Sequence, residues 1–552
     1  MTWERIRRLS AGVAGAAVLI AAVTLVARVA GFGRTFVFSQ TVGDNCLGTA
    51  YYTANQLPNV LFEIVIGGAL SGMVVPVLAA AAERGDRAEV RHTASALVTW
   101  VVLLAVPLSL LLAAVAGPAM DLMLGGAAGC DPAALRALSV RFLLVFAPQI
   151  VCYALAAVLY GILQAHRRFL APALAPLLSS LVVMAAYIVF VPLSEGRRDD
   201  LARLPTAAEL ALSVGTTAGV VALLLTALVP AARLRLGLRP RLTFPPGVAA
   251  RVRSLAFAAL LPLVAMQLSL LLAVALANRG GGGGAVVLYQ YAWSLFTLPY
   301  GVIAVPIATS AFTALSVRHA EGDRDGYTSV VAATSRACLV STAAVATALA
   351  AAAGPLAEVF AGGDPAAMRR ALLAFAPGIV GFGLVALLSR ALYASGHGRP
   401  AAAAQVAGWL VVMAAGAALV VLLPSGWAVA GLGAGTSLGL SLAAALLAAA
   451  VGRAHGRAGF AGLGRALLAA AAGAACGGAA GIAAASALDA VGVWANAGVS
   501  VLAGAAGIAV YGAVAALIDG RAVRAALTRR GAPGSGTRSD TRGHEVEDAS
   551  HG

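Results

Sequence analysis

The stretch that decides the fold runs from Val23 to Pro76 and reads VTLVARVAGFGRTFVFSQTVGDNCLGTAYYTANQLPNVLFEIVIGGALSGMVVP. Its first apolar segment carries Arg28 and Arg34. Its second apolar segment carries four polar side chains, which are Asn55, Gln56, Asn59 and Glu63. Polar groups are costly in hydrocarbon unless they face a water-filled cavity or one another. The stretch therefore predicts a polar cavity inside a bundle of membrane helices.

The composition of the whole chain supports a membrane location. The chain has 552 residues, of which 61% are hydrophobic and 11% are charged, whereas soluble proteins carry about 25% charged residues. Its apolar runs have the length of ~20 residues that spans a bilayer as a helix. The net charge of +15 comes from arginines in short loops, so it does not indicate nucleic-acid binding. We expect an all-α polytopic membrane protein.

Fourteen apolar segments follow one another along the chain, and we predict a transmembrane helix at each. They span 11–40, 48–82, 93–116, 137–163, 169–193, 208–231, 251–277, 285–316, 328–353, 370–394, 401–423, 427–452, 461–486 and 491–518. Arginines gather in every second loop, as at 84–91 and 233–241, and the loops between are acidic, mixed or nearly uncharged. Cytoplasmic loops are rich in arginine. The alternation predicts a multi-pass protein of a bacterial cell membrane with both termini in the cytoplasm.

An internal repeat indicates how these helices are organised. Residues 143–160 (LLVFAPQIVCYALAAVLY) match residues 372–389 (LLAFAPGIVGFGLVALLS) without a gap. A looser match sets Gln56-Leu57-Pro58, with a following Glu-Arg-Gly-Asp, against Thr297-Leu298-Pro299 and a following Glu-Gly-Asp-Arg. Parallel repeats with a cavity between them are a common transporter plan, in which rocking of the two lobes gives alternating access.

From the repeat and the loops we predict four regions. They are an N-lobe of six helices over 1–240, a C-lobe of six helices over 241–455, two additional transmembrane helices over 456–520 and a disordered cytoplasmic tail over 521–552.

The two arginines of the first segment suit an anionic ligand. Arg34 follows Arg28 by six residues, which in a regular helix places the side chains about 9 Å apart along the axis and roughly 120° apart around it. A bend at Gly31 and Gly33 would bring both guanidinium groups to one cavity. Guanidinium groups bind phosphate oxygens bidentately, so the pair fits a pyrophosphate-bearing substrate. Two alternatives stay open, in which Arg34 reaches the headgroup region and Arg28 pairs with Glu63.

The polar residues of the second segment have two readings as well. Asn55, Gln56 and Asn59 fall within about one helical turn and would line the same cavity or form hydrogen bonds between helices. Pro58 interrupts the helical hydrogen bonds and is a candidate gate hinge.

The sequence contains no catalytic constellation. There is no Walker loop, no metal-spaced His/Cys cluster and no intramembrane acid–base pair, so we expect no enzyme, no cofactor and no metal. Cys46 and Cys130 are compatible with an oxidising exterior, but we expect all five cysteines to be unpaired small hydrophobic side chains. The glycine run Gly280–Gly284 is expected to be a flexible external loop without a role.

The opening stretch resembles the MurJ/MviN lipid II flippases of the MOP exporter superfamily. The resemblance rests on RVAGFGR at 28–34, ANQLPN at 54–59 and LPYGV at 298–302, and on the fourteen-helix layout. It implies translocation of an undecaprenyl-pyrophosphate-linked peptidoglycan precursor from the inner to the outer leaflet, with Arg28 and Arg34 at the pyrophosphate. It also implies a groove for the lipid tail at the two C-terminal helices, and as partners the lipid-linked precursor, membrane lipids and cell-wall synthesis proteins.

The chain departs from the family pattern at charged positions. Family acids fall at Thr35 and Thr49, and family arginines fall at Phe62 and Ser294. Two competing hypotheses therefore remain beside the flippase. One is a non-transporting scaffold of a cell-wall assembly complex. The other is a MATE-like exporter of small cations, which requires an acidic cavity.

Overall fold

The computed structural model describes residues 3–528 apart from 65–77, 79–83, 245–247 and 489. Within these ranges every regular element is a helix, as the sequence predicts. The glycine-rich part of the opening stretch and the last residues of the predicted tail lie outside the described ranges. The final helix continues to Thr528, past the predicted end of the transmembrane region, with a kink at Asp519.

The helices form two bundles and a peripheral pair. The first bundle contains α1 (Trp3–Thr41), α2 (Cys46–Glu63), α4 (Arg87–Ala114), α5 (Ala116–Leu124), α6 (Pro132–Phe146), α7 (Gln149–Ala165), α8 (Leu170–Leu193) and α9 (Thr206–Ala232). The second contains α10 (Val248–Gly281), α11 (Ala285–Pro299), a π-helical turn η3 (Tyr300–Ala304), α12 (Val305–Ala320), α13 (Arg324–Ala351), α14 (Ala353–Phe360), α15 (Pro365–Ala394), α16 (Gly398–Leu422) and α17 (Ala428–His455). The pair consists of α18 (Leu463–Ser486) and α19 (Val493–Thr528).

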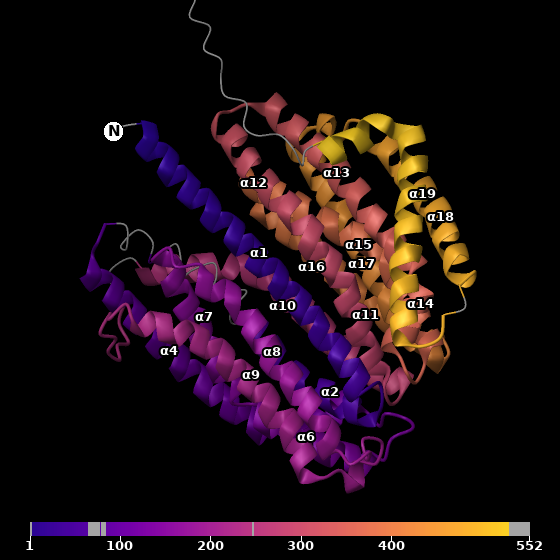
Figure 1. The fold of residues 1–552 in the computed structure, drawn as a ribbon. Coiled ribbons are helices and arrows are strands. Elements are labelled where there is room, and N and C mark those ends of the chain that lie inside the picture. The colour runs from indigo at the N-terminus through magenta and orange to yellow at the C-terminus, as the bar shows by residue number, and fades with distance from the viewer. Residues whose placement is uncertain (1–2, 65–77, 79–83, 245–247, 489, 529–552) are drawn as a thin grey trace, which may run out of the picture.

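Figure 1 shows how these parts are arranged in space. The bundle of α4 to α9 lies on one side, α1 runs between the two bundles, and α18 and α19 flank the second bundle on its far side. Helix α1 packs mainly on α8, α10 packs mainly on α16, and α18 and α19 pack on each other and on α13. Both bundles therefore contribute walls to the space beside α1.

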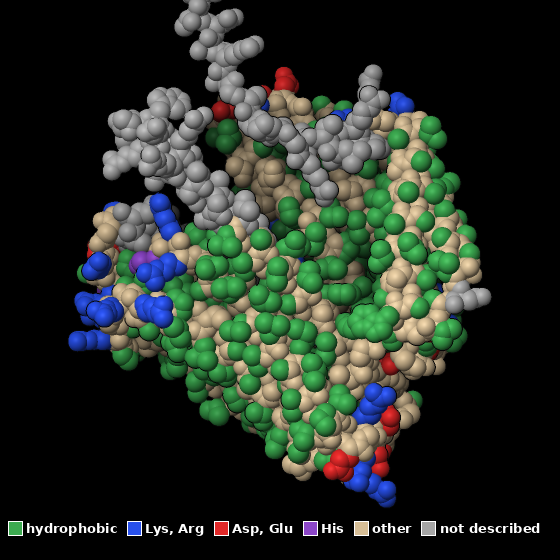
Figure 2. Space-filling model, in the orientation of Figure 1, with side chains coloured by type: hydrophobic (Ala, Val, Ile, Leu, Met, Phe, Trp, Pro, Cys, Tyr) green, Lys and Arg blue, Asp and Glu red, His purple; other side chains and the backbone are tan. Residues whose placement is uncertain are grey.

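Thirteen helical segments within the described residues are long and apolar enough to cross a membrane. They correspond to the predicted segments except the second, for which the structure describes α2 as far as Glu63. Figure 2 shows hydrophobic side chains over the middle of the visible face and charged side chains at its two ends. This distribution fits a bilayer around the middle of the bundles.

The repeat inferred from the sequence is visible in matching helix caps. Asp86 accepts hydrogen bonds from the first amides of α4, and Asp323 does so for α13. Asp131 and Asp364 cap α6 and α15 in the same way, each followed by proline in the first turn. A side-chain oxygen at this position satisfies amides that the helix leaves unpaired. Equivalent helices of the two bundles thus begin with the same device.

The backbone differs around three other prolines of the apolar segments, Pro148, Pro299 and Pro377. Pro148 separates α6 from α7, and Pro299 precedes the π turn η3. Around Pro377, in contrast, α15 is continuous. There the Ser437 hydroxyl donates to Ala374 O at 2.6 Å and accepts from the Gly378 amide at 3.0 Å. An inserted hydroxyl thus supplies partners to backbone groups next to the proline.

Candidate functional site: a polar cavity between the bundles

A cavity of about 710 Å³ lies between the bundles, beside α1. Its walls come from α1, α2 and α8 of the first bundle and from α10, α11, η3 and α15 of the second. The polar side chains on the lining are Thr24, Arg28, Thr35, Gln56, Asn59, Glu63, Gln267, Ser294, Thr297 and Tyr300. The volume falls within the range of ligand sites, about 300–1,000 Å³.

Arg28 brings the positive charge to this cavity. Its guanidinium group lies against the backbone of Gly301, so closely that a Cβ atom there would overlap it. The neighbouring Tyr300 stacks on Phe382, with ring centroids 3.7 Å apart, and its hydroxyl lies within electrostatic range of Arg28 and Arg390. Among the described residues Arg28 forms no ion pair with Glu63. The Arg28 side chain is exposed, and a cation without a carboxylate partner is available to an anionic ligand.

Arg34 lies elsewhere. It is not on the cavity lining, and its neighbours are tyrosines of the first bundle, Tyr51, Tyr52, Tyr153 and Tyr187. The expected bend at Gly31 and Gly33 is not present, because α1 is continuous from Trp3 to Thr41. In a regular helix, side chains six residues apart point in different directions. The structure therefore does not bring the two guanidinium groups together.

The polar residues of α2 divide between cavity and packing. Gln56, Asn59 and Glu63 line the cavity, while Asn55 does not. The Gln56 carbonyl oxygen accepts from Gln290 Nε2 of the second bundle at 2.8 Å. Asn59 Oδ1 accepts from the Tyr153 hydroxyl at 3.3 Å. Both readings of these residues thus hold, since Gln56 and Asn59 face the cavity and also bond to other helices.

Sequence reasoning missed the part of the site supplied by η3 and its flanks. Thr297, Tyr300 and Gly301 line the cavity, and their signal was the Leu298-Pro299 pair that repeats Leu57-Pro58. Gln267 of α10 is also on the lining. Two polar side chains of other apolar segments contact α9 instead: Arg141 pairs with Glu209 at 2.8 Å, and Gln149 donates to Thr217 at 2.8 Å.

The positions at which the chain departs from the family pattern carry neutral contacts. Phe62 stacks on Tyr153 with ring centroids 4.1 Å apart. Thr35 and Ser294 line the cavity. The Thr49 hydroxyl accepts from the Gly284 amide at 2.8 Å. Hydrogen bonding and aromatic stacking therefore replace charge at these positions.

A second hollow of about 640 Å³ adjoins the additional helices. It lies between α13, α15, α17 and α18, and its lining is almost entirely Ala, Leu, Val, Pro, Gly and Phe. Apolar lining of this kind fits acyl or prenyl chains, because hydrocarbon loses contact with water there.

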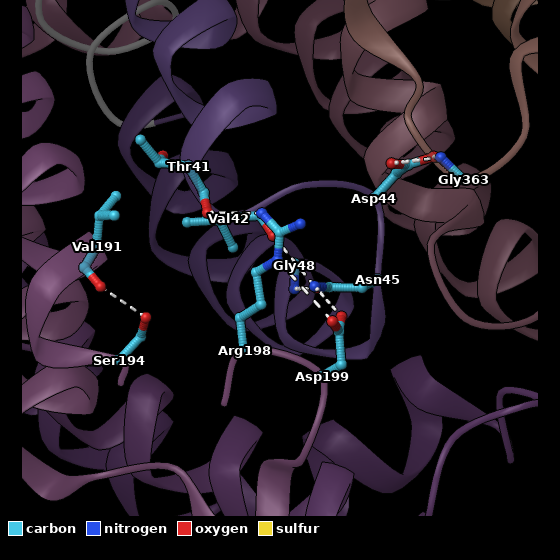
Figure 3. A network of polar contacts seen from close by, with 10 residues as sticks. All are labelled: Thr41, Val42, Asp44, Asn45, Gly48, Val191, Ser194, Arg198, Asp199 and Gly363. Carbon is cyan, nitrogen blue, oxygen red and sulfur yellow. Dashed lines mark hydrogen bonds and ion pairs between the residues drawn. The ribbon is translucent and has the colours of Figure 1, made fainter. Parts of the chain in front are cut away.

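At the end where α1 passes into α2, the two bundles are in contact. The Asp44 carboxylate accepts from the Gly363 amide at 3.0 Å (Figure 3). Gln40 Nε2 donates to Val359 O at 2.8 Å, and Asn278 Nδ2 donates to Thr53 Oγ1 at 3.0 Å. This contact region, which we call the α1–α2 end, closes the interface on one side of the cavity.

The α1–α2 end also contains a disulfide between Cys46 and Cys130. The expectation that all cysteines are unpaired is therefore wrong for this pair and holds for Cys152, Cys338 and Cys476. The spacing of 84 residues in the sequence carries no signal of the pairing, which the packing of α2 against α6 creates.

The fold and the cavity define a class of protein first: a membrane protein of two helical bundles with a polar cavity between them. A solved structure described as the inward-facing conformation of a multidrug resistance MATE family transporter of the MOP superfamily is 16% identical, with 81% of this chain and 99% of that chain covered and a TM-score of 0.62. A structure described as lipid II flippase MurJ in an inward closed conformation is 18% identical, with 91% and 98% covered and a TM-score of 0.68. At these identities the likeness concerns the fold.

The family follows from the sequence comparison. A model of the lipid II flippase MurJ family matches residues 38–496, so the chain belongs to this family. Its relatives include a probable lipid II flippase MurJ from Synechocystis sp., 33% identical over 43% of this chain and 44% of the relative, and one from Rhizobium tropici, 30% identical over 52% of each. The chain thus spans about half the length of these curated relatives. A lipid II flippase MurJ from Burkholderia cenocepacia is 27% identical over 68% of this chain and 72% of the relative.

Proposed function

We propose that this protein translocates lipid II, a polyprenyl-pyrophosphate-linked peptidoglycan precursor, from the inner to the outer leaflet by alternating access. The observation that carries the proposal is the cavity of about 710 Å³ between the bundles, with Arg28 as its cation. Family membership supports the substrate class. The proposal includes no step in which a covalent bond is made or broken.

Different residues would bind different parts of such a substrate. Arg28 would bind the pyrophosphate bidentately. Gln56, Asn59 and Thr297 offer hydrogen bonds to the sugars and the peptide. The apolar hollow between α13, α15, α17 and α18 would hold the prenyl chain. Arg34 acts indirectly in this scheme, as part of the first bundle's wall of tyrosines.

The proposal also places the molecule in the membrane. The loops with arginines at 84–91 and 233–241 would face the cytoplasm. The α1–α2 end would then face the oxidising exterior, where disulfides persist. The bodies that rock are the lobes predicted over 1–240 and 241–455, and the substrate enters from the arginine-rich side while the α1–α2 end is closed.

The test is rescue in cells depleted of their resident flippase. We expect the wild type to restore surface-exposed lipid II, and Arg28→Ala to reduce it about 10- to 100-fold, the equivalent of about 1.5–3 kcal/mol for hydrogen bonds to a charged group. Arg136→Ala, which removes an exposed arginine paired with Asp121, is the matched control and should behave as wild type.

The outcomes separate the parts of the proposal. Failure of the wild type despite normal membrane abundance would refute lipid II as the substrate. Rescue by Arg28→Ala equal to the wild type would refute the pyrophosphate role of Arg28. Arg34→Ala should reduce transport less than Arg28→Ala, since its guanidinium group is off the lining.

Glu63 favours a second candidate function, export of organic cations. It is the one carboxylate among the described lining residues of the cavity, and a carboxylate attracts cations. Efflux of a cationic dye that depends on Glu63, in a strain where lipid II rescue fails, would favour this function over the flippase.

A further inference from the structure

The glycine run 280–284, where α10 passes into α11, contacts the first bundle through its backbone. Gly283 donates its amide hydrogen to Ala128 O at 2.8 Å. Gly284 donates its amide hydrogen to Thr49 Oγ1 at 2.8 Å. The run is therefore hydrogen bonded across the interface of the two bundles, and it is not the loop without a role that the sequence suggested.

The disulfide is the surface on which this backbone rests. A Cβ atom at Gly283 would lie 2.5 Å from Cys130 Sγ and 3.2 Å from Cys46 Sγ. Real Cβ atoms do not approach other heavy atoms to less than about 3.0 Å without displacing them. The φ angle of Gly283 is in an ordinary region, because only its neighbours are positive, at +77° and +86°. Glycine at 283 is thus explained by the close approach to the disulfide alone.

Other atoms of the same loops complete the contact. A Cβ atom at Gly282 would lie 2.8 Å from Ala128 O, and one at Gly284 would overlap Asp44 O. The Asp44 side chain extends the contact to a second loop of the other bundle, since its carboxylate accepts from the amides of Gly363 and Asp364.

The covalent link does not cross the interface. Cys46 begins α2 and Cys130 precedes the cap of α6, so both belong to the first bundle. The bond therefore holds the first turn of α2, which contains Thr49, and the loop of Ala128 at the spacing that the two glycine amides require. The contacts between the bundles at this place are hydrogen bonds and van der Waals contacts, which water can replace when the bundles separate.

We propose that the glycine run 280–284 and the Cys46–Cys130 disulfide form the outer gate of the transport pathway, with the disulfide as the surface on which the glycine backbone closes. As a gate it rests on the alternating-access function proposed above. Because glycine has no side chain, closure orders no side chain of the glycine run itself. Reduction of the bond allows the first turn of α2 and the loop of Ala128 to move apart, and this movement weakens both hydrogen bonds.

The experiment is amide hydrogen exchange of the full-length protein in lipid nanodiscs. In Gly283→Ala, exchange of the peptide covering 280–288 should rise about tenfold, the equivalent of about 1.4 kcal/mol. Gly498→Ala is the matched control, because Gly498 lies in α19 with no atom within 4 Å of its added Cβ, and it should leave that peptide unchanged.

A second arm treats the wild type with a membrane-impermeant phosphine reductant. The same peptide should exchange faster, and the double variant Cys46→Ser/Cys130→Ser should show the faster rate without the reductant. Unchanged exchange at 280–288 on reduction would overturn the proposal even if Gly283→Ala does not fold. A rise confined to α2 and α6 would also overturn it, since the bond would then stabilise only its own bundle.

The readout needs no substrate, so the two proposals fail separately. If lipid II rescue fails while exchange at 280–288 responds as expected, lipid II as the substrate is refuted, and the closure of the glycine run on the disulfide stands.

Discussion

The interface between the bundles differs at the α1–α2 end and at the cavity. At the α1–α2 end, glycine backbone, the Cys46–Cys130 disulfide and the Asp44 carboxylate are in direct contact. Beside α1, the same two bundles enclose a cavity of about 710 Å³, whose polar lining consists of Arg28, Glu63 and neutral side chains. The contacts at the α1–α2 end can be replaced by water, as a gate requires. In the cavity, the exposed guanidinium group of Arg28 is accessible to an anionic ligand. The difference teaches that the proposed ligand site depends on a charged side chain, Arg28, whereas the contact at the α1–α2 end depends mainly on backbone groups.

Removal of the disulfide is expected to give the largest effect on stability. Cys46→Ser/Cys130→Ser should lose about 2–5 kcal/mol, the usual cost of deleting a native disulfide. A lowered thermal midpoint of the purified protein in detergent would show it, with Cys152→Ser, which alters a free cysteine, as the control. An unchanged midpoint would mean that the disulfide does not contribute to the stability of the protein.

A substitution at Gly301 tests whether the position of Arg28 in the cavity matters for transport. Gly301→Ala should displace the Arg28 guanidinium from its seat on η3 and reduce lipid II exposure about tenfold, near the lower value for a lost charged hydrogen bond. The rescue assay measures it. Gly512→Ala is the control, because Gly512 lies in α19, off the cavity lining, and no atom lies within 4 Å of its added Cβ. Equal rescue by both variants would show that the position of Arg28 against Gly301 is unimportant.

Tyr51→Phe probes the wall of tyrosines near Arg34 at a smaller cost. The Tyr51 hydroxyl lies 2.7 Å from the Tyr187 hydroxyl and 2.8 Å from Thr216 Oγ1. Its loss should destabilise the first bundle by about 1 kcal/mol, the net value of a hydrogen bond. Thermal unfolding would detect this, while exchange at 280–288 should not change, since the glycine run contacts other atoms. A change there would show that the two regions are coupled.

The smallest expected effect is the pH dependence of Asp44. Burial raises the pKa of this carboxyl, and the amides of Gly363 and Asp364 offset part of the rise. Because the pKa is higher when the α1–α2 end is closed than when Asp44 is exposed, protonation favours closure. This contribution is complete below the ordinary pKa of Asp and is lost as the pH rises through the raised value.

Spin labels on exposed residues of the two bundles at the α1–α2 end would measure that dependence. The fraction with a short inter-bundle distance should fall as pH rises, and Asp44→Asn should abolish the trend. Other charged groups nearby are Arg198 and Asp199, linked to Thr41 and Asn45 (Figure 3), and Asp364. A trend that survives in Asp44→Asn would assign the effect to one of those groups.

Much of the fold was predictable because apolar length and helix caps are local properties. Thirteen predicted segments match thirteen helical spans among the described residues. The looser match of the repeat contains Asp86 and Asp323, and these two residues cap α4 and α13. The candidate site was predictable in part. Arg28, Gln56, Asn59 and Glu63 were expected from polar groups in an apolar run, and the structure places all four on one cavity.

The remaining features of the site could not be predicted, because they depend on the direction in which side chains leave a helix and on contacts between residues far apart in the sequence. Whether Arg34 joins Arg28 depends on the continuity of α1, and the glycines between them do not interrupt it. The role of Tyr300 and Gly301 arises because η3 passes beside α1. Neither property is encoded in a local pattern.

The sequence by itself determined the membrane class, the helix spans, the repeat and the family signature, because burial in hydrocarbon imposes length and composition on each helix separately. The tertiary structure alone decided which arginine faces the cavity, that Cys46 pairs with Cys130 and that Gly283 packs against that bond. Those outcomes depend on how far each helix rotates about its axis and on which loops meet at the end of the bundle, and residues far apart in the chain set both.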